Sequence, residues 1–112
     1  MQIIATGGLS FPVLGASDAG QRSLKALGHR VAPLFPALTP LRGPHPGAQQ
    51  LAGLSLYQVA MHCERPQGPK GRRRVAAMRR GMVFTHRGFS GPAILDLSHH
   101  LVRWVVFGPG GR

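Results

Sequence analysis

The apolar and polar positions near the start of the chain predict a strand, a turn and a helix. Residues 2–5 form a short apolar run that ends at the glycine turn of residues 6–8, and we interpret this run as a buried strand. In the helix that follows, Asp18 suits the N-cap and Gln21 the third helical position of a capping box. Gly28 suits the position just after a helix, where a positive φ is favoured. The pattern therefore indicates a fragment of an α/β unit.

After His29 the residue composition changes to one typical of extended segments. Half of the ten prolines lie within residues 31–47, which excludes a helix there. Residues 54–63 alternate in part between apolar and polar side chains, and residues 82–85 form a second short apolar run. We interpret both as β-strands.

A basic segment and a helix complete the pattern. Residues 64–81 are rich in arginine and glycine, and they predict a mobile loop whose far end rejoins a sheet. Ser90 or Gly91 suits the cap of a helix whose first turn contains Pro92, where the missing N–H costs little. This places one helix near residues 90–101. The apolar run at residues 102–107 predicts one more strand.

Length and charge narrow the class of protein. The chain has 112 residues, which fits one small domain or a piece of a larger protein. Its 14 basic and 3 acidic residues give a formal net charge of +11, which favours an anionic partner. The single cysteine excludes an intrachain disulfide and a cysteine-pair metal site, so we expect no metal. Since there is neither a signal-peptide pattern nor an apolar run of about 20 residues, we expect an intracellular, soluble chain without membrane contact.

Two short motifs have the outline of catalytic loops but lack the required residues. Residues 15–20 have the spacing of a phosphate loop, yet Gln21 and Arg22 replace the lysine and hydroxyl residue that bind phosphate and magnesium. This argues against nucleotide hydrolysis. Ser90 resembles a nucleophile elbow, but Pro92 occupies the position where that elbow needs glycine. We therefore favour Ser90 as a helix cap.

Histidines and arginines offer the other candidate chemistry. His86 lies in a predicted turn and is the one catalytic candidate, although a lone loop histidine is usually solvated. The neighbouring His99 and His100 cannot share one helix face, which argues against a metal site. The arginine runs at residues 72–74 and 79–80 could contact nucleic acid, but that segment lacks the interleaved aromatic residues that stack on bases. A solvated basic loop is therefore favoured, and nucleic acid is not expected as a partner.

The order of several longer motifs resembles one known family. These motifs are "IIATGGLSFP", a helix ending in "ALGH", "PALTPL", "LAGLSL" and "FTHRGFSGPAILDLS". They resemble successive landmarks of the BaiN/YhiN-like NAD(P)/FAD-dependent oxidoreductases, flavoproteins that include aminoacetone oxidase. The resemblance spans residues 2–98 and is interrupted only at the basic segment.

The resemblance implies an α+β fragment built from parts of two domains. Residues 1–35 would be the C-terminal piece of a Rossmann-type FAD-binding α/β domain. Residues 36–112 would be the first part of a mainly β inserted domain that contains the helix near residues 90–101. The cofactors implied for the parent protein are FAD and NAD(P)H, and the implied substrate is a small molecule. The residues that the resemblance places beside the dinucleotide are Ala5, Thr6, Gly7, Gly8, Ser10, Phe11, Pro12, Ser90 and Gly91.

The sequence thus predicts a fragment of an FAD-dependent, NAD(P)-linked oxidoreductase. No G-x-G-x-x-G motif follows a strand, so this chain alone is expected to be inactive and not to bind FAD. Two alternatives stay open: a small basic nucleic-acid-binding protein, or a non-functional remnant. Steeply salt-dependent binding to nucleic acid would favour the first alternative.

Overall fold

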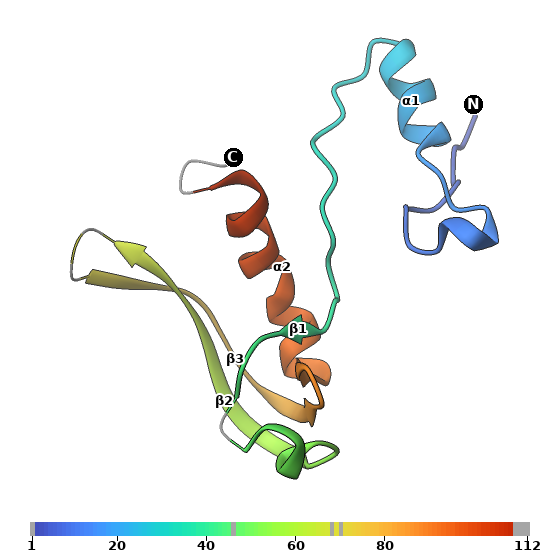
Figure 1. The fold of residues 1–112 in the computed structure, drawn as a ribbon. Helices are drawn as coiled ribbons and strands as arrows, with labels where there is room; N and C mark the ends of the chain where they lie inside the picture. The colour runs from blue at the N-terminus through green and yellow to red at the C-terminus, as the bar shows by residue number, and fades with distance from the viewer. Residues whose placement is uncertain (1, 46, 68, 70, 109–112) are drawn as a thin grey trace. The chain divides into compact units, whose positions relative to one another are not determined.

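The computed structural model describes residues 2–45, 47–67, 69 and 71–108 (Figure 1). The chain divides into two units, Met1–Leu34 and Phe35–Arg112. Within the described residues, no helix combines the length and the apolar character that a membrane crossing requires. The overall class is α+β, as the sequence predicts.

The first unit contains one short 3-10 helix, η1 (Pro12–Leu14), and one α-helix, α1 (Ala19–Ala26). The predicted N-cap position is confirmed, because Asp18 is the N-cap residue of α1. The predicted capping box is wrong, because the Asp18 side chain forms no cap hydrogen bond and pairs with Arg22 at 3.2 Å. The strand predicted at residues 2–5 is wrong, because these residues have no regular secondary structure. A strand needs a neighbour for its backbone N–H and C=O groups. Within the described part of this unit, no second strand supplies one.

The second unit is a four-stranded antiparallel sheet with one long helix against it. The strand order is β1-β4-β3-β2, and every neighbouring pair is antiparallel. The elements in chain order are β1 (Leu41–Arg42), the 3-10 helix η2 (Ala48–Leu51), β2 (Ser55–Gln67), β3 (Gly71–Thr85), β4 (Gly88–Ser90) and α2 (Pro92–Phe107).

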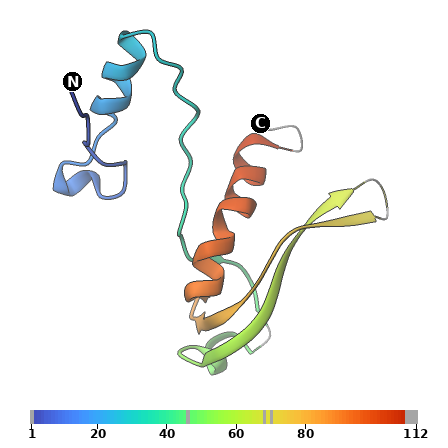
Figure 2. The ribbon, with the colours of Figure 1, turned by 180° about the vertical axis from the view of Figure 1, so that it is seen from behind.

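The mobile loop predicted at residues 64–81 is wrong, because these residues belong largely to a β-hairpin. Strands β2 and β3 pair along most of their length, for example at Met61 with Met78 and at Arg65 with Arg73. Figure 2 shows the two strands as a long twisted ribbon, which continues far beyond the three residue pairs that join β3 to β4. The composition of the segment hides this pairing, because most of its arginines occupy exposed strand positions.

The core of the second unit lies between α2 and the sheet. Ala93, Ile94 and Leu97 of α2 are buried there with Cys63 of β2 and Met82 of β3. The expected cap is confirmed, since Gly91 is the N-cap residue of α2 and Pro92 lies in its first turn.

The strand predicted at residues 102–107 is wrong, because α2 continues to Phe107. The valines at 105 and 106 are exposed on this last turn, so they form no part of the core. The ring of Phe107 contacts that of Phe35 edge-on, with centroids 5.6 Å apart. Continuing an existing helix adds one hydrogen bond per residue, and this outweighs the modest β-preference of valine.

Candidate nucleic-acid interface

The β2–β3 hairpin has two chemically different faces. Paired residues in neighbouring strands share a face, and side chains alternate between faces along each strand. The face toward α2, called the helix face, carries Val59, Met61, Cys63, Ala76, Met78 and Met82, all at least half-buried, together with Arg65, Arg73 and Arg80. The opposite face, called the open face, carries Ala60, His62, Glu64, Arg72, Arg74, Ala77 and Arg79, all exposed. The apolar pattern thus selects one face for the core and leaves a basic face in solvent.

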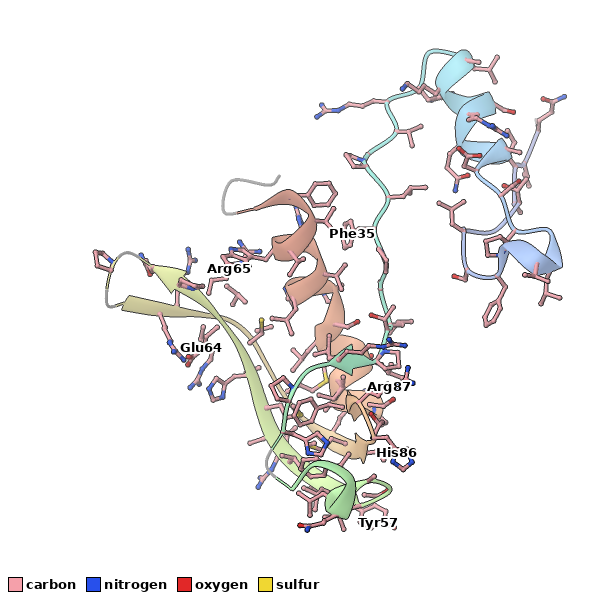
Figure 3. All side chains as sticks on the ribbon, in the orientation of Figure 1. Phe35, Tyr57, Glu64, Arg65, His86 and Arg87 are labelled. Carbon is pink, nitrogen blue, oxygen red and sulfur yellow. The ribbon has the colours of Figure 1, made fainter. Side chains whose placement is uncertain are left out.

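Positive charge is concentrated at the free end of the hairpin. We call Arg65, Arg72, Arg73 and Arg74 the arginine tip. Its one acidic neighbour in the hairpin is Glu64, whose carboxylate lies 3.2 Å from His62 Nε2 and 3.9 Å from an Arg72 nitrogen. Figure 3 shows Glu64 and Arg65 in the half of the hairpin remote from Tyr57.

Most of these arginines have no carboxylate partner. The chain contains only three acidic residues, and each is already paired: Asp18 with Arg22, Glu64 with His62 and Arg72, and Asp96 with Arg80. Within the described part of the chain, Arg73, Arg74 and Arg79 therefore form no ion pair. Their charge remains available to an external anion.

The helix face offers no reactive group to accompany this charge. Burial raises the pKa of the Cys63 thiol, with Arg65 opposing the effect, so the sulfur stays protonated near neutral pH. The Nε atom of Arg65 is buried without a hydrogen-bond partner in the described structure. No group of three metal-ligating side chains occurs among the described residues. This part of the molecule has the chemistry of a binding surface.

A pocket opens at the other end of the hairpin, beside Tyr57. The strand register is interrupted there, because Leu56 pairs with Met82 and Val59 with Arg80. Two residues of β2 therefore face the single residue Gly81, which is a β-bulge. The pocket has a volume of about 440 Å³ and is lined by Tyr57, Gln58, Arg79, Arg80, Gly81 and Pro92.

The catalytic candidate His86 lies in the turn between β3 and β4. Its side chain is exposed, and no described residue forms a hydrogen bond with it. It lines a shallow pocket of about 300 Å³ with Arg42 and Arg87. No carboxylate among the described residues orients the ring, so a catalytic role for His86 stays a prediction.

The sequence analysis overlooked His45. Its Nε2 lies 3.0 Å from the Thr85 carbonyl oxygen. Its ring packs against those of Phe84 and Phe89, with centroids 5.1 and 5.3 Å away. No local signal could have revealed it, because His45 lies in the proline-rich segment and meets these partners only in the folded sheet.

The predicted dinucleotide contacts fall into two groups, one in each unit. In the first unit, Ala5, Thr6, Gly7, Gly8, Ser10, Phe11 and Pro12 are all exposed. Gln21 Nε2 donates a hydrogen bond to the Gly7 carbonyl at 3.5 Å. In the second unit, Ser90 ends β4 and Gly91 begins α2. Gly91 has φ +94°, and a Cβ there would lie 2.9 Å from Met82 Cα. Packing against β3 therefore explains this glycine without a ligand.

Comparison with known proteins gives a family and two relatives. The family described as "HI0933-like protein barrel and H2TH domain" matches residues 35–110. The chain is 36% identical over 98 residues to the ribosomal RNA dihydrouridine synthase of Escherichia coli, strain K12. It is 34% identical over 101 residues to the protein of the same name from Haemophilus influenzae. Each alignment includes 88% of this chain but only 23% or 22% of the relative, so the chain spans less than a quarter of their length.

These relatives correct two predictions from the sequence. The predicted function, an FAD-dependent, NAD(P)-linked oxidoreductase with a small-molecule substrate, is wrong, because the relatives are named for a modification of ribosomal RNA. The expectation that nucleic acid is not a partner is overturned by the same names. The alternative of a nucleic-acid-binding protein agrees better with them.

The predicted family itself is confirmed. Its model covers nearly all of the second unit, including the sheet, the hairpin and α2. The relatives extend the likeness into the first unit. The chain therefore belongs to the HI0933-like, or BaiN/YhiN-like, family.

Proposed function

We propose that this chain is the RNA-contacting segment of an enzyme that converts uridine in ribosomal RNA to dihydrouridine. The observation that carries the proposal is the surplus of unpaired arginines on the β2–β3 hairpin, at Arg73, Arg74 and Arg79. Contacts to phosphate supply much of the affinity of proteins for nucleic acid. The relatives' names give the nucleic acid and the modification.

The hairpin suits contacts to an RNA backbone in two ways. Successive residues on one face of a strand are about 6.6 Å apart, because each residue rises roughly 3.3 Å. Arg72 and Arg74 are such neighbours on the open face, so they can contact an extended chain of phosphates at separate points. The guanidinium group is planar and binds phosphate oxygens in pairs. The arginine tip would therefore position RNA without reading its sequence.

The modification also sets a requirement for the whole protein. Dihydrouridine differs from uridine by two hydrogens added across a ring double bond, so the reaction needs a hydride donor. A flavin can donate a hydride. We propose that the flavin is FAD and that NAD(P)H reduces it. The described residues of this segment do not themselves form the strand–turn–helix cradle that a dinucleotide pyrophosphate needs. The flavin is therefore proposed for the whole protein.

The domain assignment follows as part of the same proposal. Residues 1–35 would be the C-terminal piece of a Rossmann-type FAD-binding domain, and residues 36–112 part of the inserted domain. The division of the chain at Leu34 and Phe35 supports this boundary, as does the start of the family match at residue 35.

The test measures RNA binding by the full chain. Fluorescence anisotropy would follow a labelled ribosomal RNA fragment with a uridine-containing loop at several salt concentrations. The double variant Arg74→Gln/Arg79→Gln removes the two open-face arginines that form no ion pair in the described structure. It should lower the salt-dependence slope by about 1.4, since each single-strand phosphate contact contributes roughly 0.7.

The matched control removes the same charge elsewhere. Lys25→Gln/Arg30→Gln changes two exposed basic residues of the first unit and should leave the slope close to that of the unaltered chain. An equal loss in both variants would mean that only net charge matters and that the hairpin is no interface. Absence of RNA binding by the unaltered chain would also overturn the proposal.

A further inference from the structure

Tyr57 is an aromatic side chain that the fold leaves in solvent. It is the chain's single tyrosine, and it is 86% exposed. Tyrosine normally buries much of its ring when it serves a core. Figure 3 shows Tyr57 near the start of β2, at the opposite end of the hairpin from Arg65. The ring therefore contributes little to packing in this chain.

The β-bulge explains both the exposure of Tyr57 and the space beside it. Tyr57 and Gln58 lie opposite Gly81, where the register of β2 and β3 shifts. A Cβ at Gly81 would lie 3.4 Å from the Leu56 carbonyl oxygen and 3.9 Å from Tyr57 Cα. A longer side chain at position 81 would extend into the space beside Tyr57. Glycine at this position keeps the pocket open.

Two arginines line this pocket, one with a carboxylate partner and one without. Arg80 donates a hydrogen bond to Asp96 Oδ2 at 2.7 Å, which fixes its guanidinium group against α2. Arg79 has no carboxylate partner in the described structure. The pocket has a volume of about 440 Å³ and is an open depression in the surface, not an enclosed cavity. An exposed ring, a free cation and an open depression thus occur together.

We propose that the Tyr57 pocket binds one unstacked base of a single-stranded RNA segment, with Tyr57 stacking on the base and Arg79 contacting an adjoining phosphate. The inference rests on the proposed function and specifies the form of RNA that the hairpin accepts. Single-stranded RNA offers free base faces to aromatic and arginine side chains, whereas the bases of a duplex are stacked on one another. The missing aromatic partner of the basic run is therefore supplied by β2, across the hairpin.

The distance between the pocket and the arginine tip sets the length of RNA to use. Seven residues separate Tyr57 from Glu64, the partner of Arg74, and this corresponds to roughly 23 Å of strand. A single strand of about ten nucleotides would span both, if each nucleotide adds at least the 3.4 Å found along a duplex strand. The comparison ligand is a fully paired RNA duplex of the same length.

Two variants of the full chain separate stacking from charge. Tyr57→Ala should weaken binding of the single strand about 5- to 150-fold, the loss expected for one stacked base. Tyr57→Phe keeps the ring and should stay within about twofold of the unaltered chain. Neither variant should alter binding of the duplex. An equal loss for both RNAs, or a Tyr57→Phe loss as large as that of Tyr57→Ala, would overturn the stacking proposal.

A measurement on the unaltered chain avoids dependence on any variant. Because the chain has one tyrosine, ¹³C labelling of tyrosine rings gives signals from Tyr57 alone. Stacking on a base should shift these ring signals during titration with the single strand. If the single strand binds through Arg74 and Arg79 while the Tyr57 signals stay unchanged, the stacking proposal is wrong and the proposed function stands. If the chain binds no RNA, both are wrong.

Discussion

The two faces of the β2–β3 hairpin have the same backbone and opposite chemistry. On the helix face, Cys63 and Met82 are each only 5% exposed, beneath Ile94 and Leu97 of α2. On the open face, His62, Arg74 and Arg79 extend into solvent without a covering element among the described residues. The difference shows that burial and exposed positive charge are divided between alternate residues of one strand pair, and we propose that stability and recognition are divided in the same way. Changes on the two faces should therefore have separable effects.

The largest expected effect comes from the helix face. Met82→Ala would remove a buried side chain and leave a cavity under α2, which should lower the free energy of unfolding by about 2–5 kcal/mol. Arg79→Ala, on the open face of the same strand, should change it by less than about 0.5 kcal/mol. Urea denaturation of the unaltered chain and of the two variants would measure both changes in the free energy of unfolding. Similar losses in the two variants would show that the faces do not differ as described.

A somewhat smaller effect is expected from the hydrogen bonds that fix α2. Ser98 is fully buried; its hydroxyl accepts from the Thr39 backbone N–H at 3.1 Å and donates to the Leu95 carbonyl at 2.7 Å. Ser98→Ala would leave the Thr39 N–H unpaired and should cost about 1–3 kcal/mol in unfolding free energy. Ser55→Ala, at an exposed position, is the matched control. A loss at Ser55 equal to that at Ser98 would contradict this account.

The ion pair at the edge of the helix face should contribute less. Arg80 and Asp96 are 2.7 Å apart, but their side chains are 59% and 30% exposed. Solvent screens such a pair, so Asp96→Asn should cost no more than about 1 kcal/mol, and less in high salt. A double-mutant cycle with Arg80→Met would isolate the pair. A coupling energy that does not decrease with salt would show that the pair is shielded from solvent.

The smallest expected effect is on the pH dependence of stability. Burial, followed by the charges of His99, Arg65 and Arg103, lowers the pKa of His100 below its usual 6.5. The unfolded chain therefore binds this proton at a higher pH than the folded chain. The contribution of His100 to the free energy of unfolding is fully present above about pH 6.5. It decreases as the pH falls toward the pKa of His100 in the folded chain. His100→Gln should make the loss between pH 7 and 5 slightly smaller in urea denaturation. A steeper loss of stability in the variant would contradict a lowered pKa of His100.

The start of α2 was predictable because its signals are local. Gly91 and Pro92 specify a cap and a first turn through their own φ preferences, and the structure places the helix there. The end of α2 was not predictable in the same way. The apolar run at residues 102–107 suits a strand or a buried helix equally well. Its helical state depends on continuation from the preceding turns and on the contact between Phe107 and Phe35.

Of the features of the candidate site, only its positive charge was predictable from the sequence. Three acidic residues cannot neutralise fourteen basic ones, so the sequence alone indicates an anionic partner. The aromatic residue that lines the pocket with Arg79 could not be identified along the segment, because Tyr57 lies more than twenty residues before Arg79. The two come together through the pairing of β2 with β3 and the bulge opposite Gly81.

The sequence by itself determined the family, the net charge, the cap of α1, the start of α2 and the apolar positions of the hairpin. These follow from residue type and from spacing over a few positions. Tertiary structure alone decided that the arginine-rich segment is a strand, that residues 2–5 are not, and which hairpin face α2 covers. The physical reason is the same in each case. A strand is stable only where a neighbour accepts its backbone hydrogen bonds, and that neighbour is chosen by contacts between distant parts of the chain.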